Sequence, residues 1–399
     1  MLNTIIFLSV VASIGVISAS ICSPALPLMA DYFSKDFSDL QLVISLFLAG
    51  NAIGQLLSGP FSDYFNQKSI MFTGLVLFTI SSLIAATADS MFILYGARFF
   101  QGMGTAAGPV LARAIASKVF SENKSAQIIS FGALGVGGAS MLSIMFSGMI
   151  SHISWRGCFW ITSFLGIILL LWAFFALRND LLPEVKERDS LKNKFRAMIT
   201  IFYQPQFLVN TAIHSLTYGL MYGYIGSFPF LLKGLFEEIN PKYVGIYSAY
   251  MILIYILATS IGALLVPRLT ASRLVILGVS LQLLSGLILA LFCSVPGFFL
   301  GIALFNFSLG IILPMTTAAA LSPVASKGTA SSALGLCYRL SGSFISYLIS
   351  LMPLAGGFNL GIASFAASLI SLFGLIPLTF VAYFQNAKKA YTPSTFISK

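Results

Sequence analysis

Negative charge is scarce in this sequence. Only 12 of its 399 residues are aspartate or glutamate, and it has 2 histidines and 4 isolated cysteines. The acidic residues all fall between long apolar runs or at the ends of these runs. Hydrolytic or metal chemistry needs acidic, histidine or cysteine side chains gathered at one place. The sequence therefore predicts no enzymatic activity, no metal site and no cofactor.

Charged residues of both signs make up only 9% of the chain, whereas hydrophobic residues make up 58%. A soluble domain cannot bury so much apolar surface. Reading between polar breaks gives twelve apolar runs, each close to the ~20 residues that cross a bilayer. The runs are 4–29, 39–60, 69–88, 91–112, 125–150, 157–178, 206–232, 243–266, 274–293, 297–320, 329–352 and 359–384. We therefore expect an all-α membrane protein with twelve transmembrane helices.

Lysine and arginine are unevenly divided between the two sides of this topology. With a cytoplasmic N-terminus, sixteen of them lie on the cytoplasmic side, and Arg98 and Arg339 lie within runs. The four that face outward are Lys35, Arg156, Lys233 and Lys242. Because positive loops stay inside, we expect both termini in the cytoplasm. The net charge of +10 then reflects topology and not nucleic-acid binding.

The longest polar stretch, Arg178–Arg196, divides the runs six and six. A weak internal repeat supports this division, because GPFSDYFNQKSIMFTG after the second run matches GALLVPRLTASRLVILG after the eighth, with Gly59 aligned on Gly262. Transporters are often built from such repeats. We expect an N-terminal six-helix bundle at 1–180, a cytoplasmic linker at 181–204 and a C-terminal six-helix bundle at 205–399 with a short cytoplasmic tail.

Two arginines within the apolar runs are candidate functional residues, because charge inside a membrane is costly and often marks a pathway. Arg98 shares a helical face with Gln101 and Thr105 in the fourth run. Arg339 lies in the eleventh run. The alternative for both arginines is a structural role, with the guanidinium bonded to backbone carbonyls.

Other polar side chains recur at helical spacing and are candidates for the lining of a central cavity. They are Asn51 and Gln55 in the second run, His214, Tyr218 and Tyr222 in the seventh, and Asn306 in the tenth. The alternative is that they serve helix packing, which also recruits amide and imidazole groups.

Four segments carry a resemblance to a known family: SPALPLMADYF, GQLLSGPFSDYFNQKS, ARFFQGMGTAAGPVLARAIA and SWRGCFWI. On these segments the chain resembles the major facilitator superfamily, and most closely its bicyclomycin-resistance-type drug efflux transporters. The resemblance implies a fold of two six-helix pseudo-repeats in the bacterial cytoplasmic (inner) membrane. It also implies a small-molecule substrate, and we expect a monomer.

The resemblance further assigns a role to the loop after the second run. In the family this loop latches the two bundles on the cytoplasmic side, and here its residues are Gly59, Asp63 and Lys68. The alternative is that Asp63 and Lys68 are solvated loop charges that serve topology.

The sequence departs from this family where antiporters commonly carry an acid, because Ser20 stands shortly before PALP in the first run. The fifth run also lacks the proline of the family's antiporter motif. We expect efflux of small amphipathic compounds by alternating access, with protons as a candidate coupling ion. The alternative is uptake or facilitated exchange of a metabolite or siderophore-like solute without classical proton antiport.

Overall fold

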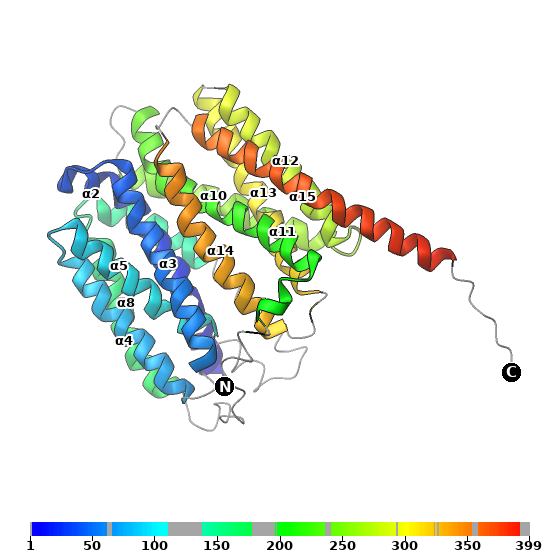
Figure 1. The fold of residues 1–399 in the computed structure, drawn as a ribbon. Coiled ribbons are helices and arrows are strands. Elements are labelled where there is room, and N and C mark those ends of the chain that lie inside the picture. Colours follow the sequence, from blue (N-terminus) through cyan, green and yellow to red (C-terminus); the bar gives the residue numbers. More distant parts are fainter. Residues whose placement is uncertain are drawn as a thin grey trace.

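The structure, a computed structural model, describes residues 2–61, 66–110, 138–177, 196, 198–235, 241–292, 294–322, 324, 327–352 and 358–391. All regular elements in these residues are helices. The N-terminal bundle contains α1 (Leu2–Ser20), η1 (Ser23–Ala25), α2 (Leu26–Phe33), α3 (Phe37–Phe61), α4 (Gln67–Ala86), α5 (Met91–Thr105), an unlabelled helix (Gly138–Ser151) and α8 (Gly157–Ala176). The C-terminal bundle contains α10 (Pro205–Leu235), α11 (Pro241–Leu265), α12 (Ala271–Leu291), α13 (Val295–Leu321), α14 (Lys327–Ser350) and α15 (Phe358–Tyr391). Figure 1 shows the two bundles on either side of the α3–α14 pair.

Each predicted apolar run coincides with helix in the described part of the chain. Eight of the spans are long and apolar enough to cross a membrane. The other four runs contain α5, Gly138–Ser151, α10 and α14. The prediction of an all-α membrane protein is therefore confirmed. The linker 181–204 lies largely outside the described residues, so the bundle limits stay a prediction.

The first span is not one continuous helix, in contrast to the predicted run. α1 ends at Ser20 and the chain continues through η1 into α2. Pro24 and Pro27 occupy early positions of η1 and α2, where proline's missing N–H is tolerated. The break turns α2 into a separate short helix at the end of the N-terminal bundle.

Glycines set the distance between α3 and α5. A Cβ atom on Gly102 would collide with the carbonyl oxygen of Phe47, and one on Gly50 would collide with that of Phe99. Small residues of this kind let two membrane helices approach closely. The close approach brings Arg98, one turn before Gly102, within hydrogen-bonding distance of the α3 backbone.

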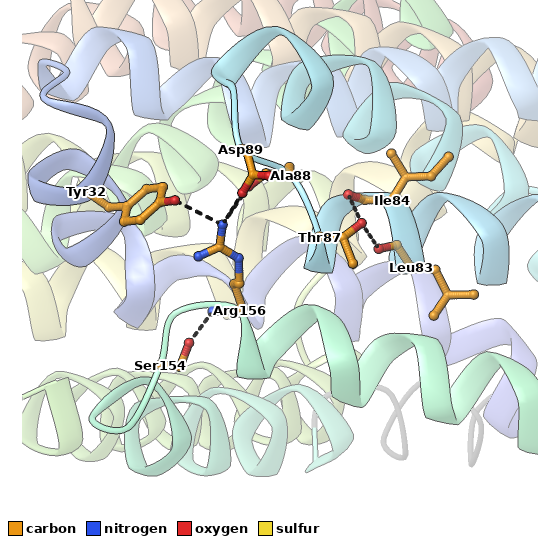
Figure 2. A network of polar contacts seen from close by, with 8 residues as sticks. All are labelled: Tyr32, Leu83, Ile84, Thr87, Ala88, Asp89, Ser154 and Arg156. Atoms are coloured by element: carbon orange, nitrogen blue, oxygen red, sulfur yellow. Dashed lines mark hydrogen bonds and ion pairs between the residues drawn. The ribbon is translucent and has the colours of Figure 1, made fainter.

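Arg156, just before α8, joins three segments at one end of the N-terminal bundle (Figure 2). Its Nη2 donates to Asp89 Oδ1 at 2.8 Å, to the Ala88 carbonyl at 2.9 Å and to the Tyr32 hydroxyl at 3.2 Å. The guanidinium also lies over the rings of Tyr32 and Trp155, 4.8 and 4.5 Å from their centroids. Because Tyr32 belongs to α2, these contacts hold α2 against its own bundle.

The same end of the molecule joins the two bundles. Asp31, next to Tyr32 on α2, pairs with Lys233 near the end of α10 at 3.1 Å. Ser23 Oγ donates to the carbonyl oxygen of Ile225 at 2.6 Å. We call the end formed by η1, α2 and the last turns of α10 the clasped end.

From the clasped end, a seam of contacts between the bundles runs along α3 and α14. The hydroxyls of Ser45 and Ser346 lie 3.0 Å apart, and Ser343 Oγ donates to the Ser45 carbonyl at 2.8 Å. Farther along, Arg339 Nη1 donates to Gln55 Oε1 at 3.0 Å. Side-chain hydroxyl and amide groups thus supply much of the polar contact between the bundles.

The α3–α5 crossing can be tested with two glycines of the same helix. We expect Gly102→Ala to lower the melting temperature of the purified protein, because a new methyl group in a packed crossing costs about 1–3 kcal/mol. Gly96 has no atom within 4 Å of a Cβ position, so Gly96→Ala should leave the melting temperature unchanged or raise it. Equal melting temperatures for the two variants would contradict this account of the crossing.

Candidate functional site

A cavity of about 210 Å³ lies between the two bundles. The N-terminal bundle lines it with small or aliphatic side chains, which are Val16, Ser20, Ser23, Ser140 and Ile144. Among the described lining residues, the aromatic side chains come from the C-terminal bundle and are Tyr218, Tyr222, Tyr224, Phe228 and Tyr255. Ser23 and Ile225 both line the cavity and bond to each other. The cavity therefore lies directly beneath the clasped end.

Four of the residues singled out in the sequence line this cavity: Ser20, Tyr218, Tyr222 and Asn306. Ser20 Oγ donates to the Val16 carbonyl at 2.7 Å. Asn306 Nδ2 donates to the Ile302 carbonyl at 2.9 Å. Both side chains thus make a hydrogen bond within their own helix while they border the cavity.

Arg98 lies inside the N-terminal bundle and is fully buried. Its Nε donates to the Val43 carbonyl at 3.0 Å, and its Nη1 donates to the Ser18 carbonyl at 3.0 Å and to Gln101 Oε1 at 2.6 Å. The guanidinium lies 4.3 Å from the centroid of the Phe47 ring. These contacts support the structural interpretation of Arg98, and a role in coupling stays a prediction.

Gln101 extends the hydrogen bonds of Arg98 to two more helices. Its Nε2 donates to Ser82 Oγ at 2.7 Å and lies 3.3 Å from Thr162 Oγ1. Arg98 and Gln101 together therefore connect α1, α3, α4, α5 and α8.

Asn51 and Thr105 form a second polar contact within the N-terminal bundle. Asn51 Nδ2 donates to Thr105 Oγ1 at 2.8 Å and to the Gly102 carbonyl at 3.2 Å. Both side chains are buried. This pair links α3 to α5 beside their glycine crossing.

Arg339 and Gln55 meet between the bundles, together with a tyrosine that the sequence reading missed. Arg339 Nη1 donates to the Tyr338 hydroxyl at 2.5 Å and lies over the Tyr338 ring, 4.6 Å from its centroid. The Tyr338 ring lies 4.7 Å from the ring of His214 and 4.5 Å from that of Tyr218. The predicted stripe on α10 thus meets α14 through Tyr338.

His214 is buried at the boundary between α10 and α13. Its Nδ1 lies 2.9 Å from Thr316 Oγ1 and 3.4 Å from Thr317 Oγ1. Thr316 Oγ1 itself donates to the Ile312 carbonyl at 2.7 Å. Because the hydroxyl proton of Thr316 is already donated to Ile312, this hydroxyl can only accept from His214. We therefore assign the imidazole proton of His214 to Nδ1, which donates to Thr316.

The predicted latch loop is described only at its edges. Gly59 lies in the last turns of α3, and Asp63 lies outside the described residues. At the start of α4 the Asn66 side chain accepts from the Lys68 backbone N–H at 2.9 Å. The Lys68 ammonium lies 5.7 Å from the centroid of the Phe174 ring. The latch role of these residues stays a prediction.

The sequence reading also missed most of the cavity's apolar wall. Tyr224, Phe228 and Tyr255 line it. The signals available in the sequence were the aromatic enrichment of α10 and α11 and two hydroxyl residues at helical spacing, Ser227 three residues after Tyr224 and Thr259 four residues after Tyr255. Tertiary packing selects which of these rings reach the cavity.

A family model described as the Major Facilitator Superfamily matches residues 8–347. The chain belongs to the Major Facilitator Superfamily. It is 23% identical to Multidrug resistance protein D of Escherichia coli (strain K12) over 392 residues, which cover 94% of this chain and 95% of that protein. It is 24% identical to the uncharacterized transporter YdgK of Bacillus subtilis (strain 168), with 86% and 87% covered. The family and these relatives identify the protein as a transporter and not an enzyme.

Solved facilitator structures share the fold. A bacterial homologue of the lysosomal transporter Spinster, in an inward-facing and occupied conformation, gives a TM-score of 0.76 at 15% identity, with 98% of each chain covered. The xylose transporter XylE from E. coli, in an inward open conformation, gives 0.70 at 14% identity, with 92% of this chain and 96% of XylE covered. These likenesses confirm the major facilitator fold.

The buried network around Arg98 predicts a stability defect. Arg98→Lys keeps the positive charge but loses the planar guanidinium that reaches Val43, Ser18 and Gln101. Each buried acceptor left unpaired costs about 1–3 kcal/mol, so we expect the melting temperature to fall by several degrees. Arg339→Lys, at a partly exposed site, should lower it less. An unchanged melting temperature for Arg98→Lys would refute the structural role.

Proposed function

We propose that this facilitator is a secondary transporter that exports small amphipathic compounds by alternating access. The observation that supports this function is the cavity between the bundles, which both bundles line and which lies beneath the clasped end. Ligand sites are typically apolar concavities with a few polar groups. Apolar side chains with hydroxyls and one amide provide that combination here.

The proposed location is a bacterial cytoplasmic membrane, with both termini in the cytoplasm. In this orientation the clasped end faces outward, so the structure is closed toward the outside. The likeness to inward-facing relatives agrees with this state. Relatives that are named multidrug resistance proteins favour efflux.

The positions of the described acidic residues bear on whether proton antiport drives transport. Those in the N-terminal bundle are Asp31, Asp36, Asp39 and Asp89, all near the clasped end. Ser20, at the cavity, offers a hydroxyl and not a carboxylate. This observation favours a second candidate function, which is uptake or facilitated exchange of a metabolite or siderophore-like solute without classical proton antiport.

The direction of transport can be measured with a panel of amphipathic compounds in cells with and without the protein. We expect lower accumulation of some panel members when the protein is present, because the exporter removes them from the cytoplasm. The control is a matched strain that makes a Gly245→Leu variant at equal abundance. We expect this variant to favour a state open to the outside. Higher accumulation would favour the uptake alternative, and unchanged accumulation of every compound would count against export.

Next to the clasped end, the first turns of α11 approach the Gly138–Ser151 helix at a pair of glycines, Gly245 and Gly148. A Cβ atom on Gly245 of α11 would lie 2.9 Å from Gly148 Cα and 2.9 Å from the Ile144 carbonyl oxygen. We expect Gly245→Leu to hold the helices apart there and to favour a state open to the outside. A cysteine placed at Ser248, in the cavity lining, should then react faster with an impermeant thiol reagent in intact cells.

The matched control for this variant is Gly262→Leu on the same helix. The nearest atoms to a Cβ at Gly262 lie 3.9 and 4.0 Å away, so this change should not alter labelling. Labelling at position 248 that is equally slow in all three proteins would show that the glycine contact does not control closure.

A further inference from the structure

We propose that the cavity selects uncharged compounds that contain aromatic rings, and that, among the described residues, those of the C-terminal bundle provide the surface that binds these rings. The inference rests on the proposed transport function and names its substrate class. It follows from the unequal composition of the two cavity walls and from the positions of the nearest charges.

The two walls of the cavity differ in chemistry. Five aromatic side chains and the thioethers of Met221 and Met251 come from α10 and α11. The opposite wall of the N-terminal bundle carries Val16, Ile144 and serine hydroxyls among its described residues. Aromatic rings and methionine sulfur both interact favourably with the rings of a ligand. A planar ring therefore finds its partners on the C-terminal wall.

None of the described side chains that line the cavity carries a charge. The two arginines of the membrane region are engaged elsewhere, since Arg98 bonds within the N-terminal bundle and Arg339 bonds to Gln55 and Tyr338. An ion that enters the cavity would lose hydration without meeting an opposite charge among the described lining residues. An uncharged solute can instead use the Asn306 amide and the hydroxyls of the lining.

The free energies of ring contact and of desolvation favour an uncharged solute over a lipophilic cation. A cation over tyrosine rings gains about 0.5–2 kcal/mol. Removing an ion from water without a counter-charge costs several kcal/mol. The attraction of the rings is therefore too small to offset the cost of removing a cation from water. An uncharged ring compound keeps the aromatic contacts without that desolvation penalty. The same penalty applies to an anion that cannot reach Arg339.

The test compares two fluorescent probes with the same rings. N-phenyl-1-naphthylamine is uncharged, and 1-anilinonaphthalene-8-sulfonate adds one negative charge. Saturable binding to the purified protein is measured from fluorescence, with protein-free detergent subtracted. We expect the uncharged probe to bind at least about tenfold more tightly, which corresponds to about 1.4 kcal/mol. Equal affinity, or tighter binding of the sulfonate, would overturn the proposed selectivity.

Substitutions on α11 test which wall binds the ring. Tyr255→Leu should weaken binding of N-phenyl-1-naphthylamine about threefold to tenfold, the range expected for losing a ring contact. Tyr255→Phe keeps the ring and should bind almost as the parent protein does. Tyr250 lies on the same helix but is 58% exposed and outside the cavity, so Tyr250→Leu is the matched control.

A substitution on the opposite wall completes the set. Val16→Ala should change the affinity for the uncharged probe less than twofold, because it removes no ring. A loss as large as that of Tyr255→Leu would refute the assignment to the C-terminal bundle. Melting temperatures are measured for every variant, so that weaker binding caused by loss of the fold can be recognised. Tyr255→Phe keeps the ring and therefore shows whether loss of the ring itself weakens binding.

The inference and the proposed function fail in different ways. Movement of the uncharged probe across proteoliposome membranes tests transport, while equilibrium binding tests selectivity. Selective binding without any protein-dependent movement would support the ring site and count against transport. Protein-dependent movement with equal binding of both probes would support transport and overturn the selectivity.

Discussion

Arg98 places a positive charge inside the N-terminal bundle, and the backbone around it must hold carbonyl oxygens in position to compensate that charge. Ser18 of α1 and Val43 of α3 supply these oxygens, and Gln101 connects the same guanidinium to α4 and α8. If any of these helices moved, the buried guanidinium of Arg98 would lose hydrogen-bond partners. A buried charge without partners is strongly unfavourable. The bundle is therefore expected to move as a single body.

The C-terminal bundle is held together differently. Its helices pack through aromatic clusters, such as the rings of Tyr224, Phe228 and Phe305, and through single hydroxyl bonds such as Ser285 Oγ to the Gly301 carbonyl. In the described residues, the two bundles meet through serine hydroxyls, the hydrogen bond from Arg339 to Gln55 and one exposed ion pair. Contacts of this kind are individually weak. Rigid bundles joined by weak contacts suit a rocking motion around a central site.

The helices were predictable because a bilayer requires apolar runs of a fixed length with all backbone groups bonded internally. The site was less predictable, because helical spacing identifies a face but not the neighbour that it meets. The stripe that contains Arg98 and Gln101 faces the interior of its own bundle. The similar stripe of Tyr218 and Tyr222 reaches the cavity. Tyr255 follows Ser248 by seven residues and precedes Thr259 by four, but this spacing does not show that its ring reaches the cavity, which packing decides.

The ion pair between Asp31 and Lys233 lies on the surface, with 63% and 49% of the two side chains exposed. Mobile ions screen such a pair, because the Debye length at physiological ionic strength is only about 8 Å. In the proposed orientation this pair faces the medium outside the cell, and the buried network of Arg98 does not. Through this pair, the salinity of the surroundings would then alter the balance between closed and open states from the outer side of the membrane.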